Sequence, residues 1–423
     1  MGVHLDPAVD RPLLDGARGP GVQLAMRVIV RMADVAGADS LIDISAAHID
    51  SSLYLGEAPL EFIERLADLG ARVVVPSTCN VGGVDEGGWK AAGVSPRHAG
   101  RALRQMKALV RMGCKPTWTC APYQNGHRPA LGDHVAWGES NAVVFANAVL
   151  GARTERYPDL LDIAAAITGR VPAVGLHLDE GRAGQILVRV HGLPLKLRQS
   201  DDLYPVLGHV VGAVAGERVP VVDGLDVSPT EDQLKAFGAA AATSGAVALF
   251  HLPGVTPEAP TLREAFRGSQ PLETVTVDLE RLRAARRRLC TTAEERLDAV
   301  VLGSPHFSLD EIRRLAALVE GRTRHPGVRF LVTTSRVVRA VAQSAGLIEP
   351  LQRFGAEIVV DTCVLTSPVL ATTTATVLMT SSAKYAHYLP SLLGGHVVLG
   401  SVEDCVVSAG RGRILVDESL WHA

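Results

Sequence analysis

The feature that most constrains the fold of this chain is a repeated order of short apolar segments, polar tips and amphipathic helices. In the second half, segments that read as strands lie at residues 300–302, 329–332, 358–360, 377–379 and 397–399. Helical periodicity covers residues 309–319 and 337–345 between them. Strands that alternate with helices pair in parallel, because each connecting helix crosses back over a face of the sheet. We therefore predict an α/β fold with mainly parallel sheets flanked by helices.

The first 250 residues show the same order. Helices are predicted at residues 21–36, 60–69, 99–112 and 230–244, and strands at residues 41–45, 71–76, 173–177 and 246–250. Polar residues follow the first two strands, among them Ser45, His48, Thr78 and Asn80. In parallel sheets ligands collect at the carboxyl ends of the strands, so these residues are candidates for a site. Each is also consistent with a turn or a helix cap.

The length of 423 residues exceeds that of a single ordinary core, so two or three domains are expected. Residues 1–20 are rich in Pro, Gly and Asp and are predicted to form an extended arm. The expected division is then a first α/β region at residues 21–200, a peripheral or inserted α/β region at 201–270, and a C-terminal α/β region at 271–423. These boundaries follow a polar run near residue 200 and a proline-rich loop that ends near residue 270.

Composition argues against several classes of function. Hydrophobic residues make up 47% of the chain, and a net charge of −3 leaves no basic face for nucleic acid. No apolar run reaches the roughly 20 residues that span a bilayer, and the first residues lack a signal pattern. We therefore expect a cytoplasmic protein with no nucleic-acid partner and no membrane partner.

Six cysteines are scattered along the chain, which favours thiols, metal ligands or catalysis over a disulfide framework. Cys120 is held by the rigid Pro122, Cys363 stands at a strand tip, and Cys405 opens a helix, where the N-terminus favours the thiolate. A single cysteine taken alone is more often buried and inert. Three thiolates from separate loops can hold an iron–sulfur cluster, either 4Fe–4S or 2Fe–2S, and can leave one iron open as a Lewis acid.

Polar residues also precede an apolar run at residues 142–150. Glu139, Ser140 and Asn141 stand at its start, where a buried carboxylate needs a partner or a ligand. Arg153 is predicted either to pair with Glu139 or to bind a substrate carboxylate through two parallel N–H groups of its guanidinium. Lys384 follows a predicted strand, and we expect it to bind a carboxylate or a phosphate, or to neutralise a cluster.

Several blocks of the sequence resemble the large, catalytic subunit of aconitase X. The blocks are residues 45–48 (SAAH), 119–123 (TCAPY), 137–143 (WGESNAV), 151–154 (GART), 303–306 (GSPH), 361–363 (DTC), 382–385 (SAKY) and 404–405 (DC). They run in order from about residue 40 to about residue 412, so the resemblance covers nearly the whole chain.

The resemblance implies an aconitase-like multidomain architecture, and an iron–sulfur cluster held by Cys120, Cys363 and Cys405. It implies a hydro-lyase that dehydrates cis-3-hydroxy-L-proline or mevalonate 5-phosphate. The candidates for catalysis are then Lys384, Ser45 and His48. The candidates for substrate binding are Thr78, Asn80, Tyr123, Glu139, Ser140, Asn141, Arg153 and Ser382. A binding or regulatory homologue without catalysis is the alternative.

In this family part of the active site comes from a small swivelling domain, either fused or supplied as a separate subunit. The chain ends at Ala423, soon after the Cys405 block. We therefore expect that this chain lacks the swivelling domain and works with a small partner subunit on a small hydroxy acid.

Overall fold

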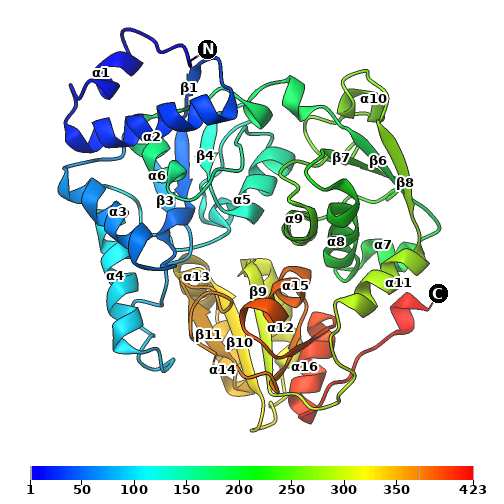
Figure 1. The fold of residues 1–423 in the computed structure, drawn as a ribbon. Helices are drawn as coiled ribbons and strands as arrows, with labels where there is room; N and C mark the ends of the chain where they lie inside the picture. The colour runs from blue at the N-terminus through cyan, green and yellow to red at the C-terminus, as the bar shows by residue number, and fades with distance from the viewer. Residues whose placement is uncertain (1, 371, 423) are drawn as a thin grey trace. The chain divides into compact units, whose positions relative to one another are not determined.

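The structure, a computed structural model, describes residues 2–370 and 372–422 (Figure 1). The chain divides into two compact units, residues 1–183 and residues 184–423, and each is described here by itself. Three of the sheets among the described residues contain only parallel strand pairs, and the two-stranded sheet is antiparallel. The predicted α/β fold with mainly parallel sheets is therefore confirmed.

The first unit contains short strands and six α-helices. The helices are α1 Asp10–Leu14, α2 Pro20–Ala36, α3 Glu57–Asp68, α4 Pro96–Arg111, α5 Ser140–Phe145 and α6 Leu161–Thr168, and α5 continues as a π-helical turn at Ala146–Leu150. The strands are β1 Leu41–Asp43, β2 Ala46–Ile49, β3 Ser77–Cys79, β4 Val135–Trp137 and β5 Arg170–Pro172. Strands β3, β2 and β4 form a parallel sheet in that order, in which His48 lies between Thr78 and Trp137.

Several expectations for the first unit need correction. The strand predicted at 41–45 ends at Asp43 as β1, and a second strand, β2, follows at residues 46–49 in a different sheet. The strand predicted at 71–76 begins only at Ser77, because Pro76 has no N–H to donate to a ladder. Residues 173–177 form no strand, since Gly175 turns the chain at a φ of 54° into a short 3₁₀ helix.

The N-terminal arm is also not extended throughout. It contains α1, and the buried carboxylate of Asp10 accepts a hydrogen bond of 2.8 Å from the Arg170 guanidinium. A carboxylate that is buried must be paired, so this ion pair ties the arm to strand β5.

The second unit begins with a three-stranded parallel sheet in the order β7-β6-β8. Its strands are β6 Ile186–Val190, β7 Pro220–Asp223 and β8 Glu273–Val277, and its helices are α7 Leu195–Gln199, α8 Leu203–Ala215, α9 Glu231–Gly245, α10 Leu262–Ala265 and α11 Leu279–Arg288. Helices α8 and α9 approach so closely that a Cβ at Gly208 would lie 2.2 Å from the Phe237 carbonyl oxygen. The strand predicted at 246–250 is absent, because only His251 bridges to β7.

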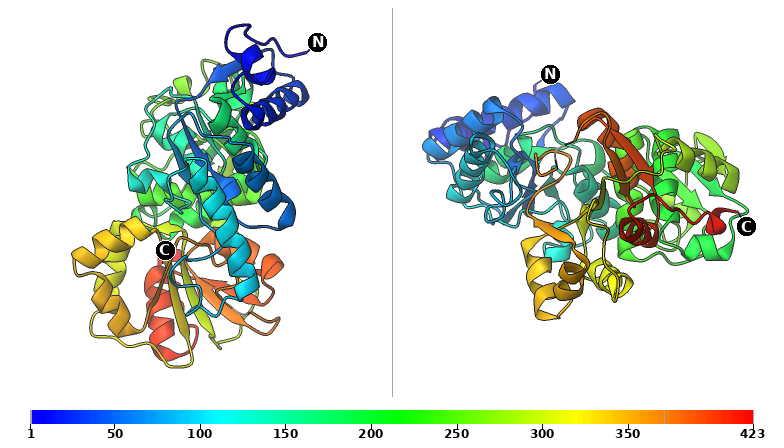
Figure 2. Two further views of the ribbon diagram at one scale, coloured as in Figure 1. Left: turned by 90° about the vertical axis from the view of Figure 1, so that its left-hand side faces the viewer. Right: turned by 90° about the horizontal axis from the view of Figure 1, so that it is seen from below.

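A five-stranded parallel sheet in the order β11-β10-β9-β12-β13 completes the second unit (Figures 1 and 2). Its strands are β9 Ala299–Phe307, β10 Arg329–Thr334, β11 Glu357–Val360, β12 Val377–Thr380 and β13 His396–Leu399, as the sequence predicts within a few residues. Its helices are α12 Leu309–Val319, α13 Arg336–Ser344, α14 Ile348–Phe354, α15 Ala383–Leu392 and α16 Val402–Arg411. Helix α12 packs on α13, α14 and α16, whereas α15 packs on α8 and α9. A capping box of Ser308 and Glu311 explains why α12 begins where it does.

No helix in the described part of the chain is long and apolar enough to cross a membrane.

Candidate functional site

In the first unit, the carboxyl ends of β2, β3 and β4 bring three polar side chains to one edge of the sheet. Asp50 directly follows β2, Asn80 directly follows β3, and Glu139 is the second residue after β4. The side-chain amide of Asn80 donates a short hydrogen bond to Asp50 Oδ1. The parallel register therefore assembles this group from three segments that are far apart in the sequence.

His48 and Thr78 lie just behind this edge. The Nδ1 atom of His48 is 2.8 Å from Thr78 Oγ1, and both residues are buried. Burial lowers the pKa of His48 well below its usual value, and the neighbouring His127 adds to the effect. His48 is therefore a neutral imidazole at neutral pH, which can hold a proton on either ring nitrogen.

The loop that carries Cys120 is fixed from two sides. The backbone N–H of Thr119 donates to the Cys79 carbonyl at the end of β3, at 3.2 Å. The Asn141 amide donates to the Cys120 carbonyl at 2.9 Å and to the Tyr123 hydroxyl at 3.0 Å. Cys120 itself is half-buried, so its thiol is held at the sheet edge without being closed off.

The three polar residues at the start of α5 have different surroundings. Glu139 is the N-cap and accepts a hydrogen bond of 2.8 Å from the Ala142 N–H, which a helix N-terminus favours. Asn141 is buried beside Cys120 and Tyr123, whereas Ser140 is exposed. The three residues therefore lie at the start of a buried helix, and their role in substrate binding stays a prediction.

Ser45 and Arg153 lie at the opposite end of the same sheet. Ser45 precedes β2, and its hydroxyl donates to the His134 carbonyl at 3.2 Å. Arg153 bridges to His134, and its guanidinium pairs with Asp179 at 2.5 Å. The ion pair of Arg153 is thus with Asp179 and not with Glu139. Strand β2 has four residues, so Ser45 is roughly 13 Å from the carboxyl edge at about 3.3 Å per residue.

In the second unit, Cys363 follows the edge strand β11. The residue Asp361 has a φ of 64°, and its carboxylate accepts hydrogen bonds from Arg336 at 2.6 and 2.9 Å. The ring of His306, at the end of β9, donates to the Thr362 carbonyl at 3.0 Å. These contacts on both sides of Thr362 hold the half-buried Cys363 at the carboxyl edge of the sheet.

Cys120 and Cys363 share one backbone feature. Each follows, by two residues, a non-glycine residue in the left-handed region: Trp118 at a φ of 42° and Asp361 at 64°. Such conformations cost of order 1–3 kcal/mol and cluster at functional sites. The strained turns support the view that these two thiols are placed for chemistry.

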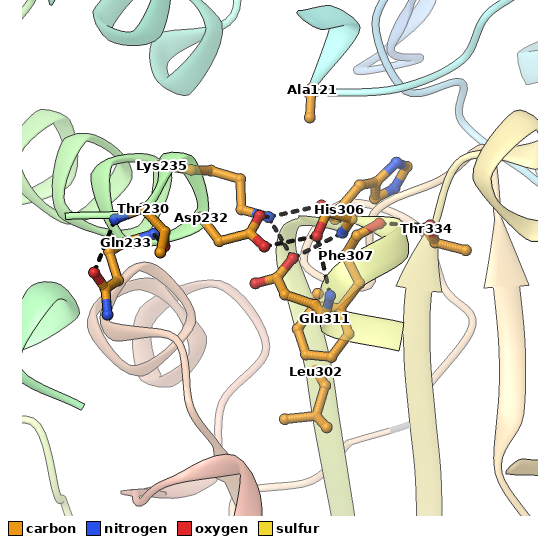
Figure 3. Close-up of polar contacts among 12 residues, drawn as sticks. Ala121, Thr230, Asp232, Gln233, Lys235, Leu302, His306, Phe307, Glu311 and Thr334 are labelled. Atoms are coloured by element: carbon orange, nitrogen blue, oxygen red, sulfur yellow. Dashed lines mark hydrogen bonds and ion pairs between the residues drawn. The ribbon is translucent and has the colours of Figure 1, made fainter. Parts of the chain in front are cut away.

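A buried ionic cluster supports the end of β9 (Figure 3). Lys235 of α9 is fully buried, and its ammonium group contacts the carboxylates of Asp232, at 3.0 Å, and of Glu311. Burial lowers the pKa of Lys235, but the charges of Glu311 and Asp232 together raise it by more than burial lowers it, so the net shift is upward. The lysine therefore stays charged and joins α9 to the turn between β9 and α12, where Asp232 also accepts from Ser308 at 2.8 Å.

Ser382 and Lys384 lie at the carboxyl end of β12. Ser382 caps α15, and its hydroxyl donates to the Ser304 carbonyl at 2.5 Å. Both residues line a small cavity of about 50 Å³ in the second unit, together with Ser304, Ser381 and Lys235. Glu311 also lines the cavity and pairs with Lys235, so the positive charge that suits an anionic group comes from Lys384, with several hydroxyl groups beside it.

Cys405 has a different environment from the other two predicted ligands. It lies in α16, is fully buried, and belongs to the same apolar core as Met379, Val406 and Ala409. Burial raises the pKa of the Cys405 thiol well above its usual value, and Asp404 and Asp202 add to the effect. The strand that precedes α16 is β13, and it lies at the opposite edge of the sheet from β11, the strand that precedes Cys363.

The thiols therefore fit an iron–sulfur cluster unequally. Cys120 and Cys363 have the access and the rigid support that a ligand needs. Cys405 is enclosed by apolar side chains, so with no metal beside it burial favours the neutral thiol. Within residues 2–370 and 372–422, no group of three or more His, Cys, Asp and Glu side chains has metal-binding geometry.

Two charged residues of these sites, Asp50 and Lys235, are not among the site candidates that the sequence yields. Asp50 follows a strand, a position that marks a candidate, but the carboxylates around it come from distant segments. Lys235 is at position i+3 from Asp232 on a predicted helix, which reads as an exposed ion pair.

Comparison with known proteins agrees with this architecture. Family models described as the aconitase X first, second and third domains match residues 3–180, 184–287 and 297–411. The chain is 48% identical to a cis-3-hydroxy-L-proline dehydratase of Pseudomonas aeruginosa over 99% of its length, which is 72% of that protein. It is 40% identical to a phosphomevalonate dehydratase large subunit of Methanothermobacter thermautotrophicus, over 93% of this chain and 95% of that one.

A solved structure is similar over nearly the whole chain. The holo-form of aconitase X from Thermococcus kodakaraensis superimposes with a TM-score of 0.84 and 32% identity, and covers 96% of this chain and 100% of that one. The three domain matches, the identities and this structural similarity lead to one assignment: the chain belongs to the aconitase X family.

Proposed function

We propose that this chain is the large subunit of an iron–sulfur hydro-lyase that eliminates water from a small hydroxy acid, cis-3-hydroxy-L-proline. The observation that carries the proposal is the 48% identity to a protein of that name, which extends over 99% of this chain. A second relative of the same name, from Hypocrea jecorina, is 47% identical over 95% of this chain.

A second candidate substrate is mevalonate 5-phosphate. The phosphomevalonate dehydratase large subunits are 34–40% identical and match at least 95% of their own length. The small cavity lined by Lys384 and several hydroxyl groups suits a phosphate as well as a carboxylate. The lower identity makes this the second choice.

We assign the residues to roles by their placement. Cys120 and Cys363 are the thiols that we propose as cluster ligands, and a bound cluster would supply a Lewis acid. Lys384 and Ser382 bind the anionic group of the substrate at the end of β12. Thr78, Asn80, Tyr123, Glu139 and Asn141 line or support the edge of the first sheet, where His48 is a neutral proton acceptor.

We also propose a small partner subunit that carries a swivelling domain. The relative from Pseudomonas aeruginosa has sequence outside the matched 72%, and the archaeal relatives are named large subunits. Elimination of water works best in a pocket that excludes solvent, and a second component closing over the strand ends would provide such a pocket.

The test is an assay of the purified chain, loaded with iron and sulfide, on both substrates with and without a candidate small subunit. We expect water elimination from cis-3-hydroxy-L-proline only when the partner is present, and a much lower kcat/KM for mevalonate 5-phosphate. Full activity of the chain alone would contradict the two-component proposal. A preference for the phosphorylated substrate would move the assignment to the second candidate. No activity on either substrate in the complex would favour a binding or regulatory homologue.

A further inference from the structure

Asp50 occupies a confined position at the carboxyl edge of the β3-β2-β4 sheet. It follows β2 directly, and the backbone at the end of β4 packs against it. A Cβ at Gly138 would lie 2.8 Å from the Asp50 Cβ and 2.9 Å from an oxygen of Asp162. Only glycine fits there, so the Asp50 side chain is held between β4 and the Asn80 amide.

Asp50 and its neighbour Asp162 share the site unequally. Asp162 accepts hydrogen bonds from the Asp50 N–H at 2.5 Å, the Ser51 N–H at 3.1 Å, the Ser51 hydroxyl and the Ile163 N–H at 2.6 Å. Four donors favour the carboxylate form of Asp162, although burial outweighs them and leaves the pKa of Asp162 raised. Among the described residues, the Asp50 carboxyl group accepts one hydrogen bond, from Asn80.

The groups that face Asp50 favour its protonated form. They are Glu139 at the start of α5, Asp162 of α6 and Asp159 before α6, all of them acidic. Burial, followed by the charges of Glu139 and Asp162, raises the pKa of Asp50 to about 8, against a smaller opposite effect of the Asn80 hydrogen bond. At neutral pH Asp50 is therefore mainly a carboxylic acid.

A second observation points to a ligand at this edge. The Oδ1 atom of Asn80 is buried, with the residue 2% exposed, and has no hydrogen-bond partner in the part of the chain that the structure describes. The Nε2 atom of His48 is buried in the same way. Buried polar atoms are nearly always paired, so unpaired ones beside a half-buried acid indicate that a polar group binds there.

We propose that Asp50, held by Asn80, is the catalytic acid that protonates the leaving hydroxyl group of the substrate. The inference rests on the proposed function and names a residue for one step of it. The C–O bond breaks, and its electron pair stays on the oxygen. That oxygen takes the proton of Asp50 and leaves as water, while a base removes the proton from the neighbouring carbon and the C–H pair becomes the double bond. Asp50 is left as a carboxylate and regains a proton from solvent.

The first test is Asp50→Asn in the active holoenzyme. We expect kcat for elimination to fall by about 10²- to 10⁴-fold, with KM nearly unchanged. The wild-type kcat should fall above a pH of about 8, where the acid loses its proton, and this alkaline limb should disappear in the variant. Incorporation of solvent deuterium at the carbon that loses its proton should persist in the variant, because the base is intact. Asp159→Asn, which removes an exposed neighbouring charge, is the matched control and should retain the rate.

Equal loss of elimination and of deuterium exchange in Asp50→Asn would overturn the assignment, and so would a retained rate. The second test does not depend on turnover. In the full chain with ¹³C-labelled aspartate carboxyl groups, NMR titration should show one carboxyl group that titrates near pH 8 and is absent in Asp50→Asn. If the wild type is inactive on both substrates but this signal is present, the proposed function fails and the protonated acid stands. If the signal is missing, the inference is wrong whatever the activity.

Discussion

The side-chain amide of Asn141, in the first turn of α5, donates a hydrogen bond of 2.9 Å to the carbonyl oxygen of Cys120. It also donates to the hydroxyl group of Tyr123. The ring of Tyr123 stacks on the ring of Phe145, with the two ring centroids 3.6 Å apart. A buried amide that bonds a loop carbonyl is costly to remove, because the carbonyl then stays unpaired. The position of the Cys120 thiol is thus set by a residue of the following helix.

Asn141→Ala should lower the free energy of unfolding by about 1–3 kcal/mol and should weaken iron retention, because it frees the Cys120 loop. Ser95→Ala is the matched control. It removes the cap of α4, at 3.3 Å from the His98 N–H, and should cost about 1 kcal/mol without affecting iron. Denaturant unfolding and iron analysis measure the two effects. Equal iron content in both variants would show that Asn141 acts only on stability.

Cys120→Ser and Cys363→Ser should each abolish the iron–sulfur absorption of anaerobically purified protein, because both thiols are half-buried and rigidly supported. Cys405→Ser should retain the iron and lose stability, because its thiol packs in an apolar core. Cys114→Ser, at another buried cysteine, is the control and should also retain iron. Loss of iron in Cys405→Ser, but not in Cys114→Ser, would restore Cys405 to the ligand set.

Lys235→Met should destabilise the protein by about 3–5 kcal/mol, because it leaves the Glu311 carboxylate buried without its cation. Arg313→Met, on helix α12 that also carries Glu311, breaks an exposed ion pair with Asp310 and should cost less than about 1 kcal/mol. Thermal unfolding of the two variants compares the sites directly. Similar midpoints would mean that the Lys235 cluster contributes no more than a surface pair.

Lys384→Ala should leave the iron–sulfur absorption unchanged and should lower kcat/KM, because its proposed partner is the anionic group of the substrate. Lys107→Ala, on the exposed face of α4, is the matched loss of one positive charge. Steady-state kinetics at two salt concentrations separates a local contact from general attraction. Equal kinetics in the two variants would remove Lys384 from the site.

The stability of the protein should depend on pH through Asp50. The pKa of this carboxyl group is about 8 in the folded protein and about 3.9 in an unfolded chain. Between these values the folded state holds a proton that the unfolded state has released, so stability falls as pH rises from about 4 to about 8. Asp50→Asn removes this dependence. The melting temperature of the variant minus that of the wild type should therefore increase from pH 5 to pH 8. A constant difference across that range would show that the pKa is not raised.

Local sequence determines much of this fold. Helix α12 occupies the predicted Leu309–Val319. The Ser308 and Glu311 capping box fixes its first turn, and the apolar periodicity that follows depends only on residues near one another in the sequence. Strands β9 to β13 form at the predicted apolar segments, because strands that are buried on both faces appear in the sequence as nearly continuous apolar runs. The family resemblance rests on the same local blocks and is confirmed by the domain matches.

Only the tertiary structure decides which residues become chemically distinct. Residues 246–250 have strand composition but form no strand, and the adjacent His251 makes only an isolated bridge to β7, because pairing depends on another segment. Cys405 stands near a helix N-terminus, which favours a thiolate, yet the core around α16 raises the pKa of its thiol. Asp50 becomes an acid with a high pKa only because Asn80, Glu139 and Asp162 meet at one sheet edge. Electrostatic properties depend on burial and on charges that the fold brings together, and neither can be read from neighbours in the sequence.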